Sequence, residues 1–244
     1  MKTVKQAAIL CGGLGTRLHP ITLEIPKPLV RVGNRPMLEL VLSKLVRSVI
    51  SEAVLLTGYR SGQVEDYFGD GSKFNLKLIY SEEGKPLGSA GAIVQARELL
   101  EENFLVCNCD TISNYDLRRL FHHHLTRKAL ATLLLAQVEQ IERFGIVELS
   151  DHERVSRFLE KPRPDQTKSR LANLGIYALN KEALSYATKD SFSMERELFP
   201  PYCRDGKLFG ETLSKKDEWL DVGTIQELHT VNTEISQGKH AWLF

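Results

Sequence analysis

The sequence predicts an α/β fold with a central, mixed and mostly parallel sheet. Apolar segments of strand length alternate with amphipathic segments of helix length through the first half of the chain. A glycine-rich turn follows the first apolar segment, as it often does where a strand leads into a helix. Alternation of this kind implies right-handed crossovers between parallel strands. The 244 residues suit one domain, 1–244, which we divide into 1–130, 131–224 and 225–244.

The first half supplies the helix-covered part of this sheet. We expect helices at Pro36–Val49, where one face is apolar and proline stands at the start, at Gly62–Phe68 and at Ser89–Leu100. Strands are expected at Val4–Leu10, Ala53–Thr57, Leu76–Tyr80 and Phe104–Asn108.

After about residue 130 long helices become rare. Strands are expected at Ala131–Val138, Gly145–Leu149, Val155–Leu159 and Ala172–Leu179, and a closing helix at Ile225–Glu234. This change of pattern predicts a mixed sheet in the second half.

Composition excludes several classes of protein. The net charge of +1 argues against a nucleic-acid binder, which needs a basic face. No stretch approaches the roughly 20 apolar residues of a membrane span, and the N-terminal segment does not resemble a signal peptide. We therefore expect a cytoplasmic protein with no membrane partner. The four cysteines lack the paired spacing of a zinc site.

Residues 7–30, AAILCGGLGTRLHPITLEIPKPLV, carry the strongest local signal. Glycines let backbone N–H groups approach phosphate oxygens closely. The dinucleotide fingerprint fails because its third glycine and the later ribose-binding acid are absent, and a Walker loop fails because no Gly-Lys-Ser/Thr is present. The glycines therefore predict a phosphate cradle of another kind.

The rest of this long segment supports a binding role. Pro26 and Pro28 restrict the backbone on either side of Lys27. Arg17 adds a planar, permanently charged fork suited to phosphate. The alternative is a surface turn with two solvated cations.

At this point the sequence resembles the sugar-1-phosphate nucleotidylyltransferases, and within them the guanylyltransferases for mannose- and manno-heptose-1-phosphate. Motifs that look like those of the family run in family order from residue 7 to 224. They are GGLGTRL with PKPL, PLGSAG, NCD, FGIVE, EKP, N-x-G-x-Y and W-x-D-x-G-T. The resemblance implies a Rossmann-like, three-layer α/β/α nucleotidyltransferase fold, with nucleotide bound by 1–130 and sugar phosphate by 131–224.

The implied reaction is attack by a sugar-1-phosphate on the α-phosphorus of a nucleoside triphosphate, with release of pyrophosphate. The nucleophile is already an anion, so catalysis reduces to positioning and charge neutralisation. The resemblance assigns Arg17 to the β- and γ-phosphates and Lys27 to the α-phosphate. Asp110 and Asp221 would hold Mg²⁺, which prefers oxygen ligands. The alternatives are a helix N-cap for Asp110 and an ordinary turn for Asp221.

The nucleotide would be bound mainly by the first half of the chain. We assign base selection to Glu83, with Glu82 as the alternative, because a carboxylate accepts the two adjacent N–H donors of guanine. GTP is therefore expected. The alternative is that both glutamates face solvent. The full set of expected nucleotide-binding residues is Leu10, Gly12, Gly13, Gly15, Thr16, Glu83, Pro86 and Gly88.

The sugar phosphate would be bound by Gly145, Glu160, Lys161 and Asn173. By itself, the Glu160-Lys161 pair beside a proline reads as an exposed turn. Two positions depart from the family pattern: Cys109 replaces a usual glycine and Phe144 a usual tyrosine. Neither departure removes a charged catalytic group, so they affect substrate detail more than reaction type.

Three further alternatives remain open. One is a uridylyl- or thymidylyltransferase acting on glucose-1-phosphate or another sugar-1-phosphate. Another is a catalytically silent regulatory paralogue that binds nucleotide sugars, and the third is an acceptor such as phosphocholine. The sequence leaves the oligomeric state open, with a homo-oligomer among the alternatives. His122, His123 and His124 diverge on a helix, and we expect them to form a solvent-facing surface rather than a metal site.

Overall fold

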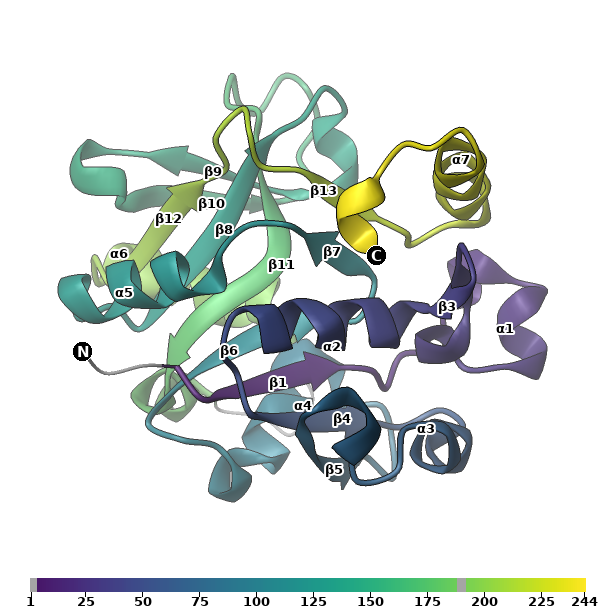
Figure 1. Cartoon of the computed structure of the whole chain (residues 1–244). Helices are drawn as coiled ribbons and strands as arrows, with labels where there is room; N and C mark the ends of the chain where they lie inside the picture. The colour runs from purple at the N-terminus through teal and green to yellow at the C-terminus, as the bar shows by residue number, and fades with distance from the viewer. Residues whose placement is uncertain (1–3, 188–191) are drawn as a thin grey trace. The chain divides into compact units, whose positions relative to one another are not determined.

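The computed structural model describes residues 4–187 and 192–244 (Figure 1). The chain forms two compact units, and it passes between them repeatedly. Unit 1 contains Leu87–Val106 and Asp116–Lys216 together with Val4, and unit 2 contains Lys5–Pro86, Cys107–Tyr115 and Asp217–Phe244. The expected single domain with three successive parts stays a prediction.

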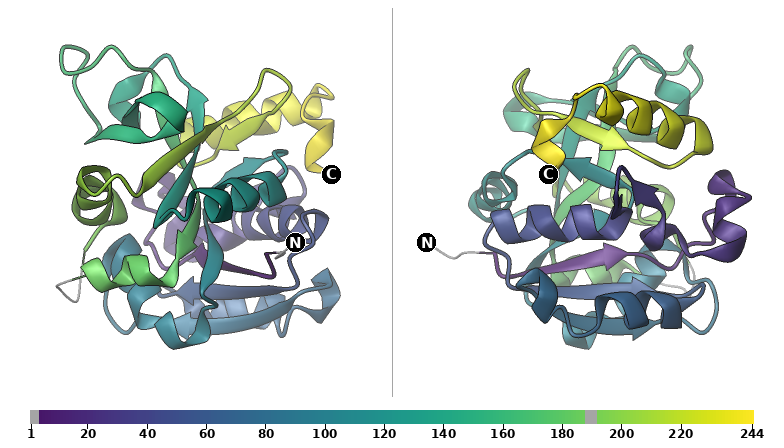
Figure 2. Two further views of the ribbon diagram at one scale, coloured as in Figure 1. Left: turned by 90° about the vertical axis from the view of Figure 1, so that its left-hand side faces the viewer. Right: turned by 45° about the vertical axis from the view of Figure 1, so that its right-hand side comes forward.

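Three parallel strands form the sheet of unit 2. Strand β4 (Glu52–Thr57) lies between β1 (Gln6–Leu10) and β5 (Lys77–Glu82). The central residues of β1 and β4 are almost wholly buried, as expected for parallel strands covered on both faces. Helix α2 (Met37–Arg47) runs alongside β1 (Figures 1 and 2), and α3 (Ser61–Phe68) follows β4.

The long segment after β1 is structured throughout. It contains the 3₁₀ turn η1 (Thr16–Leu18), helix α1 (Ile21–Glu24) and the 3₁₀ turn η2 (Lys27–Leu29). A hairpin of β2 (Arg31–Val32) and β3 (Arg35–Pro36) then leads into α2. The segment is therefore a series of short helical turns followed by a hairpin.

A second, two-stranded sheet completes unit 2. Strand β7 (Thr111–Ser113) pairs antiparallel with β13 (Trp219–Asp221), and Asp221 lies opposite Thr111. Asp110 therefore precedes a strand, which excludes its alternative role as a helix N-cap. Helix α7 (Ile225–Ser236) follows, and Thr224 caps it by accepting the backbone N–H of Glu227. The 3₁₀ turns η3 (Ser72–Phe74) and η9 (Ala241–Leu243) also belong to this unit.

Unit 1 has a mixed sheet. Its strands run in the order β6, β11, β9 and β10, and β8 pairs with both β11 and β12. The β8–β12 pair is parallel, whereas β11 is antiparallel to β8 and β9. The bounds are β6 (Asn103–Asn108), β8 (Ala131–Gln137), β9 (Gly145–Leu149), β10 (Val155–Glu160), β11 (Leu171–Asn180) and β12 (Leu208–Thr212).

Helices and short turns connect these strands. The helices are α4 (Gly88–Gln95), α5 (Leu117–Arg127) and α6 (Phe199–Arg204), and a π-helical turn η8 (Met194–Leu198) precedes α6. The 3₁₀ turns are η4 (Arg97–Leu99), η5 (Ile141–Arg143), η6 (Asp151–Glu153) and η7 (Lys181–Tyr186).

The structure confirms the predicted α/β class and its mixed sheet. The helix expected at Ser89–Leu100 is shorter, because the chain tightens into η4 after Gln95, where Leu99 N–H bonds the carbonyl of Ala96. Strands β7 and β13 are too short for the periodicity to reveal, and β12 was not among the expected strands. Within the described residues, we find no helix with the length and apolar character needed to cross a membrane.

Candidate active site

The glycine-rich segment folds onto itself around Gly15. This residue has φ +64°, a conformation that favours glycine. A β-carbon at Gly15 would lie 3.0 Å from the Thr22 methyl group and 3.3 Å from Cβ of Lys27. The Thr22 hydroxyl donates a 2.8 Å hydrogen bond to the Gly15 carbonyl. Gly15 therefore allows the chain around η1, which contains Arg17, to pack against Lys27 at the start of η2.

Lys27 forms a nearly buried ion pair with Asp110. Its Nζ contacts Oδ2 of Asp110, and the two side chains are only 15% and 9% exposed. Burial by itself would lower the pKa of Lys27, but the negative charge of Asp110 opposes it and the pKa is raised. The lysine is therefore held in its charged form beside the carboxylate.

Gly223 marks the point where the other charged groups meet. A β-carbon on Gly223 would lie 3.1 Å from Nη2 of Arg17, 3.2 Å from Oδ1 of Asp221 and 3.3 Å from Oδ2 of Asp110. The Val222 N–H also bonds the Asp110 carbonyl at 3.0 Å. Two carboxylates and a guanidinium thus face one small volume in unit 2. Two carboxylates at one point are the oxygen donors that suit Mg²⁺.

Glu83 packs against two glycines on the neighbouring strand ends. Its Oε1 occupies the space where a β-carbon on Gly12 would lie, and a β-carbon on Gly58 would be 2.9 Å from the same oxygen. The Glu83 N–H bonds the Thr57 carbonyl at 2.9 Å. The Glu82 carboxylate instead accepts a hydrogen bond from the Ser61 hydroxyl. The structure thus brings Gly12 and Glu83 together, whereas the carboxylate of Glu82, at the end of β5, contacts the first residue of α3.

The remaining predicted nucleotide residues are more dispersed. Leu10 ends β1 and Thr16 begins η1. No described atom lies within 4 Å of a β-carbon built on Gly13, so that side of the loop is open. Pro86 is the last residue of unit 2 before the chain enters unit 1.

Gly88 belongs to unit 1 and starts α4. It has φ +74°, and a β-carbon there would lie 2.5 Å from the Phe192 carbonyl oxygen. The N–H of Ala90 bonds the same carbonyl at 3.1 Å. Glycine at this position is therefore required by the close approach of the backbone near Phe192.

The four predicted sugar-phosphate residues all lie in unit 1. Gly145 is paired with Glu160 across strands β9 and β10. A β-carbon on Gly145 would lie 2.5 Å from Cζ of Phe158 and 3.1 Å from Oε2 of Glu160. The absence of a side chain at Gly145 therefore leaves room for the Glu160 carboxylate.

Burial raises the pKa of Glu160, and the negative charge of Glu195 raises it further. Lys161 follows with its Nζ 3.9 Å from Oε1 of Glu160 and its side chain half exposed. The Lys161 N–H bonds the Phe144 carbonyl at 3.0 Å, which fixes the turn after β10.

Asn173 is buried on β11 and has both ends of its amide bonded. Its Oδ1 accepts the Gly175 N–H at 3.2 Å, and its Nδ2 donates to the Tyr177 hydroxyl at 3.0 Å. Tyr177 in turn donates to Oε1 of Glu195 at 3.3 Å. These contacts connect Asn173 to a polar network that the sequence reading did not include.

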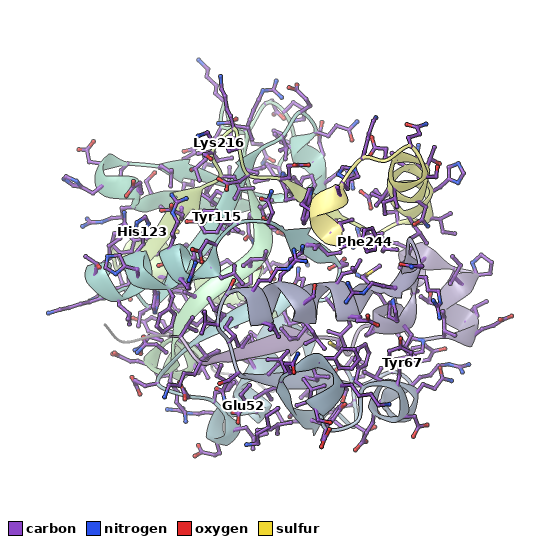
Figure 3. The ribbon with its side chains drawn as sticks, viewed as in Figure 1. Glu52, Tyr67, Tyr115, His123, Lys216 and Phe244 are labelled. Atoms are coloured by element: carbon purple, nitrogen blue, oxygen red, sulfur yellow. The ribbon has the colours of Figure 1, made fainter. Side chains whose placement is uncertain are left out.

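The histidine triplet differs from its prediction at one position. His124 is not solvent-facing: it is buried against Thr132 and Asn103, and burial lowers its pKa to about 4. His123, labelled on α5 in Figure 3, contacts Glu211 through Nδ1. The expectation failed at His124 because it shares the buried face of α5 with the apolar residues.

A surface hollow of about 450 Å³ lies beside these histidines, and none of the predicted site residues lines it. We assign the candidate site to the charged groups around Gly223, because the charged groups of a site, and not the size of a hollow, determine the reaction that it can perform. The lining residues of the hollow are His122, His123, Thr126, Arg127, His152 and Glu153.

Sequence reasoning missed three site residues. Gly223 and Tyr177 stand inside motifs already noted, W-x-D-x-G-T and N-x-G-x-Y, so their spacing gave a signal. Glu195 had none, because a glutamate in a charged segment usually faces solvent.

Comparison with known proteins places the chain in a family. Residues 6–238 match the family described as Nucleotidyl transferase, and the chain belongs to it. This confirms the resemblance that the motifs indicated.

Named relatives agree with this assignment. A probable mannose-1-phosphate guanylyltransferase from Oryza sativa is 36% identical over 92% of this chain and 63% of its own length. The mannose-1-phosphate guanylyltransferase from Mycobacterium tuberculosis is 34% identical over 95% of this chain and 65% of its own length. The chain thus spans less than two thirds of these relatives.

Solved structures share the fold. A protein named as a glucose-1-phosphate thymidylyltransferase from Bacillus anthracis, in complex with sucrose, is 28% identical with a TM-score of 0.85 and covers 94% of each chain. HddC from Yersinia pseudotuberculosis complexed with GMP-PN is 25% identical, with a TM-score of 0.79 over 95% of this chain and 100% of its own.

Proposed function

We propose that this protein transfers a guanylyl group from GTP to a sugar-1-phosphate of the mannose or manno-heptose type. The observation that carries the proposal is the meeting of Arg17, Asp110 and Asp221 around Gly223, with Lys27 paired to Asp110. The names of the mannose-1-phosphate guanylyltransferase relatives support the guanine and the sugar.

In the proposed reaction an oxygen of the sugar phosphate attacks the α-phosphorus of GTP. A new P–O bond forms there, the bond to the β-phosphate oxygen breaks, and pyrophosphate leaves with the electron pair. The attacking phosphate is mostly a dianion at neutral pH because its second pKa is about 6, so no general base is needed.

Each cation has a separate role in this proposal. Lys27 neutralises charge on the α-phosphate, and Arg17 neutralises the departing pyrophosphate. Asp110 and Asp221 would hold Mg²⁺, which supplies Lewis-acid neutralisation of the phosphate oxygens when it is bound. Asp110 therefore contacts Lys27 and would also be a ligand of Mg²⁺.

Glu83 would read the base. Its carboxylate accepts hydrogen bonds only, and guanine presents two adjacent donors on its pairing edge. Gly12 and Gly58 leave the space that this carboxylate occupies. Gly145, Glu160, Lys161 and Asn173 would bind the sugar phosphate, and we keep a cytoplasmic location as a prediction.

The test is a matrix of GTP, UTP, dTTP and CTP against mannose-1-phosphate, a manno-heptose-1-phosphate and glucose-1-phosphate, with pyrophosphate release as the readout. We expect GTP with a manno-configured acceptor to give the highest kcat/KM. A preference for UTP or dTTP would favour the uridylyl or thymidylyl alternative, which the thymidylyltransferase neighbour keeps in view. Absence of turnover with every pair would favour a silent regulatory protein.

Glu83→Gln supplies the matched test of base selection, with Glu82→Gln as its control. We expect the Glu83 variant to lose at least about 10-fold in kcat/KM for GTP, the size of one hydrogen bond to a charged group. The Glu82 variant should stay close to wild type because that carboxylate is engaged by Ser61. Equal losses in the two variants would contradict the assignment.

A further inference from the structure

The polar network behind Asn173 ends on Glu195, in the π-helical turn η8. The Glu195 carboxylate accepts hydrogen bonds from three hydroxyl groups of unit 1. Ser193 donates at 2.6 Å and Ser89 at 3.1 Å, both to Oε2, and Tyr177 donates at 3.3 Å to Oε1. A partly buried carboxylate with this many donors is held in one orientation.

The direction of these hydrogen bonds is determined by chemistry. An ionised carboxylate can only accept, so the Tyr177 hydroxyl must give its single proton to Glu195. The hydroxyl oxygen then has lone pairs only for Asn173, and the Asn173 amide must turn its Nδ2 towards it. The Asn173 Oδ1 correspondingly faces the Gly175 N–H. Glu195, acting through Tyr177, and the Gly175 N–H thereby specify the same orientation of the Asn173 amide.

We propose that Glu195 is a positioning residue for the sugar-1-phosphate, which holds the Nδ2 end of the Asn173 amide in place through the Tyr177 hydroxyl while the Gly175 N–H holds the Oδ1 end. This inference rests on the proposed function and names a residue that the motifs did not contain. Once Nδ2 has donated one hydrogen to Tyr177, its second hydrogen is available for an oxygen of the sugar. The site is then suited to a sugar hydroxyl whose oxygen accepts a hydrogen bond from Asn173 Nδ2.

Two further observations connect Glu195 with the predicted binding residues of unit 1. Its negative charge raises the pKa of Glu160, after the larger effect of burial. Ser89, which donates to Glu195, also accepts the Met194 N–H at 3.0 Å and stands next to Gly88 at the start of α4. Glu195 therefore ties α4 and β11 to the same turn.

Glu195→Gln is the direct test, because it keeps the shape and allows the side chain to donate as well as accept. We expect its KM for the sugar-1-phosphate to rise about 10-fold while the KM for GTP changes less than about 2-fold. Tyr177→Phe should give a similar rise, and the double variant should be no worse than either single variant, since both break the same chain of bonds.

Glu197→Gln is the matched control on the same turn. Its carboxylate accepts the Ser193 N–H at 2.6 Å, so its loss perturbs η8 without touching the Tyr177–Asn173 path. A rise in KM for the sugar equal to that of Glu195→Gln would mean that the turn matters only structurally, and would overturn the proposal.

A measurement without substrate separates this inference from the proposed function. The side-chain amide signals of Asn173 in an NMR spectrum of ¹⁵N-labelled protein should shift in Glu195→Gln and Tyr177→Phe and stay in place in Glu197→Gln. Unmoved Asn173 signals in both of the first two variants would overturn the positioning role. Failure of wild-type protein to use any sugar-1-phosphate would instead overturn the proposed function.

Discussion

Removing the positive charge of Lys27 should lower the free energy of unfolding, apart from any effect on catalysis. The Lys27–Asp110 pair is almost buried, with side-chain exposures of 15% and 9%. Lys27→Met leaves Asp110 without its direct counter-charge in a poorly solvated place. Breaking such a pair typically costs about 3–5 kcal/mol. We expect a loss of about 3 kcal/mol in unfolding free energy, because Arg17 lies close by and offsets part of the charge of Asp110.

A second substitution separates the loss of one charge from the loss of the whole ion pair. In Lys27→Met/Asp110→Asn both charges are gone, and neutral pairs often replace buried ion pairs at little cost. We expect the double variant to recover to within about 1 kcal/mol of wild type while remaining inactive. For a chain of this length the single variant should melt roughly 6–12 °C lower.

The assay is urea unfolding followed by circular dichroism, combined with pyrophosphate release. Lys73→Met, an exposed lysine on η3, serves as the control and should unfold like wild type. A single variant as stable as wild type, or a double variant no more stable than the single one, would refute the buried-pair account.

Two other perturbations test separate parts of the structure. Gly145→Ala places a methyl group 3.1 Å from the Glu160 carboxylate and 2.5 Å from Phe158, so steady-state kinetics should show KM for the sugar-1-phosphate raised about 10-fold or more with KM for GTP nearly unchanged. His124 has a pKa near 4 in the fold against 6.5 when exposed, so its contribution is present above pH 6.5 and is lost as the pH falls towards 4. Over that range wild type should lose roughly 3 kcal/mol more unfolding free energy than His124→Asn, and equal losses would contradict the burial effect.

Much of the fold was predictable because buried strands and helices have characteristic patterns of apolar residues in the sequence. Strands β1 and β4 are continuous apolar runs buried on both faces, and α2 shows a single apolar face. The short strands β7 and β13 carry only three residues each, too few for periodicity to detect. Their pairing places Asp221 opposite Thr111, next to Asp110, and depends on contacts between distant parts of the chain.

The residues of the candidate site also differ in how far the sequence alone reveals them. Arg17 and Lys27 were visible because glycines and prolines around them restrict the backbone locally. Glu195 was invisible because its role depends on three hydroxyl groups from separate segments. His124 was misjudged because sequence position alone does not show which side of α5 meets the sheet.

The fate of the α-phosphorus tests guanylyl transfer most directly. The protein is incubated with GTP labelled at the α-phosphate, mannose-1-phosphate and Mg²⁺, and the products are separated. We predict that the label appears in a GDP-sugar and that pyrophosphate forms in equal amount, both abolished by EDTA. Label found in GDP or GMP, or a GDP-sugar formed without pyrophosphate, would contradict the account.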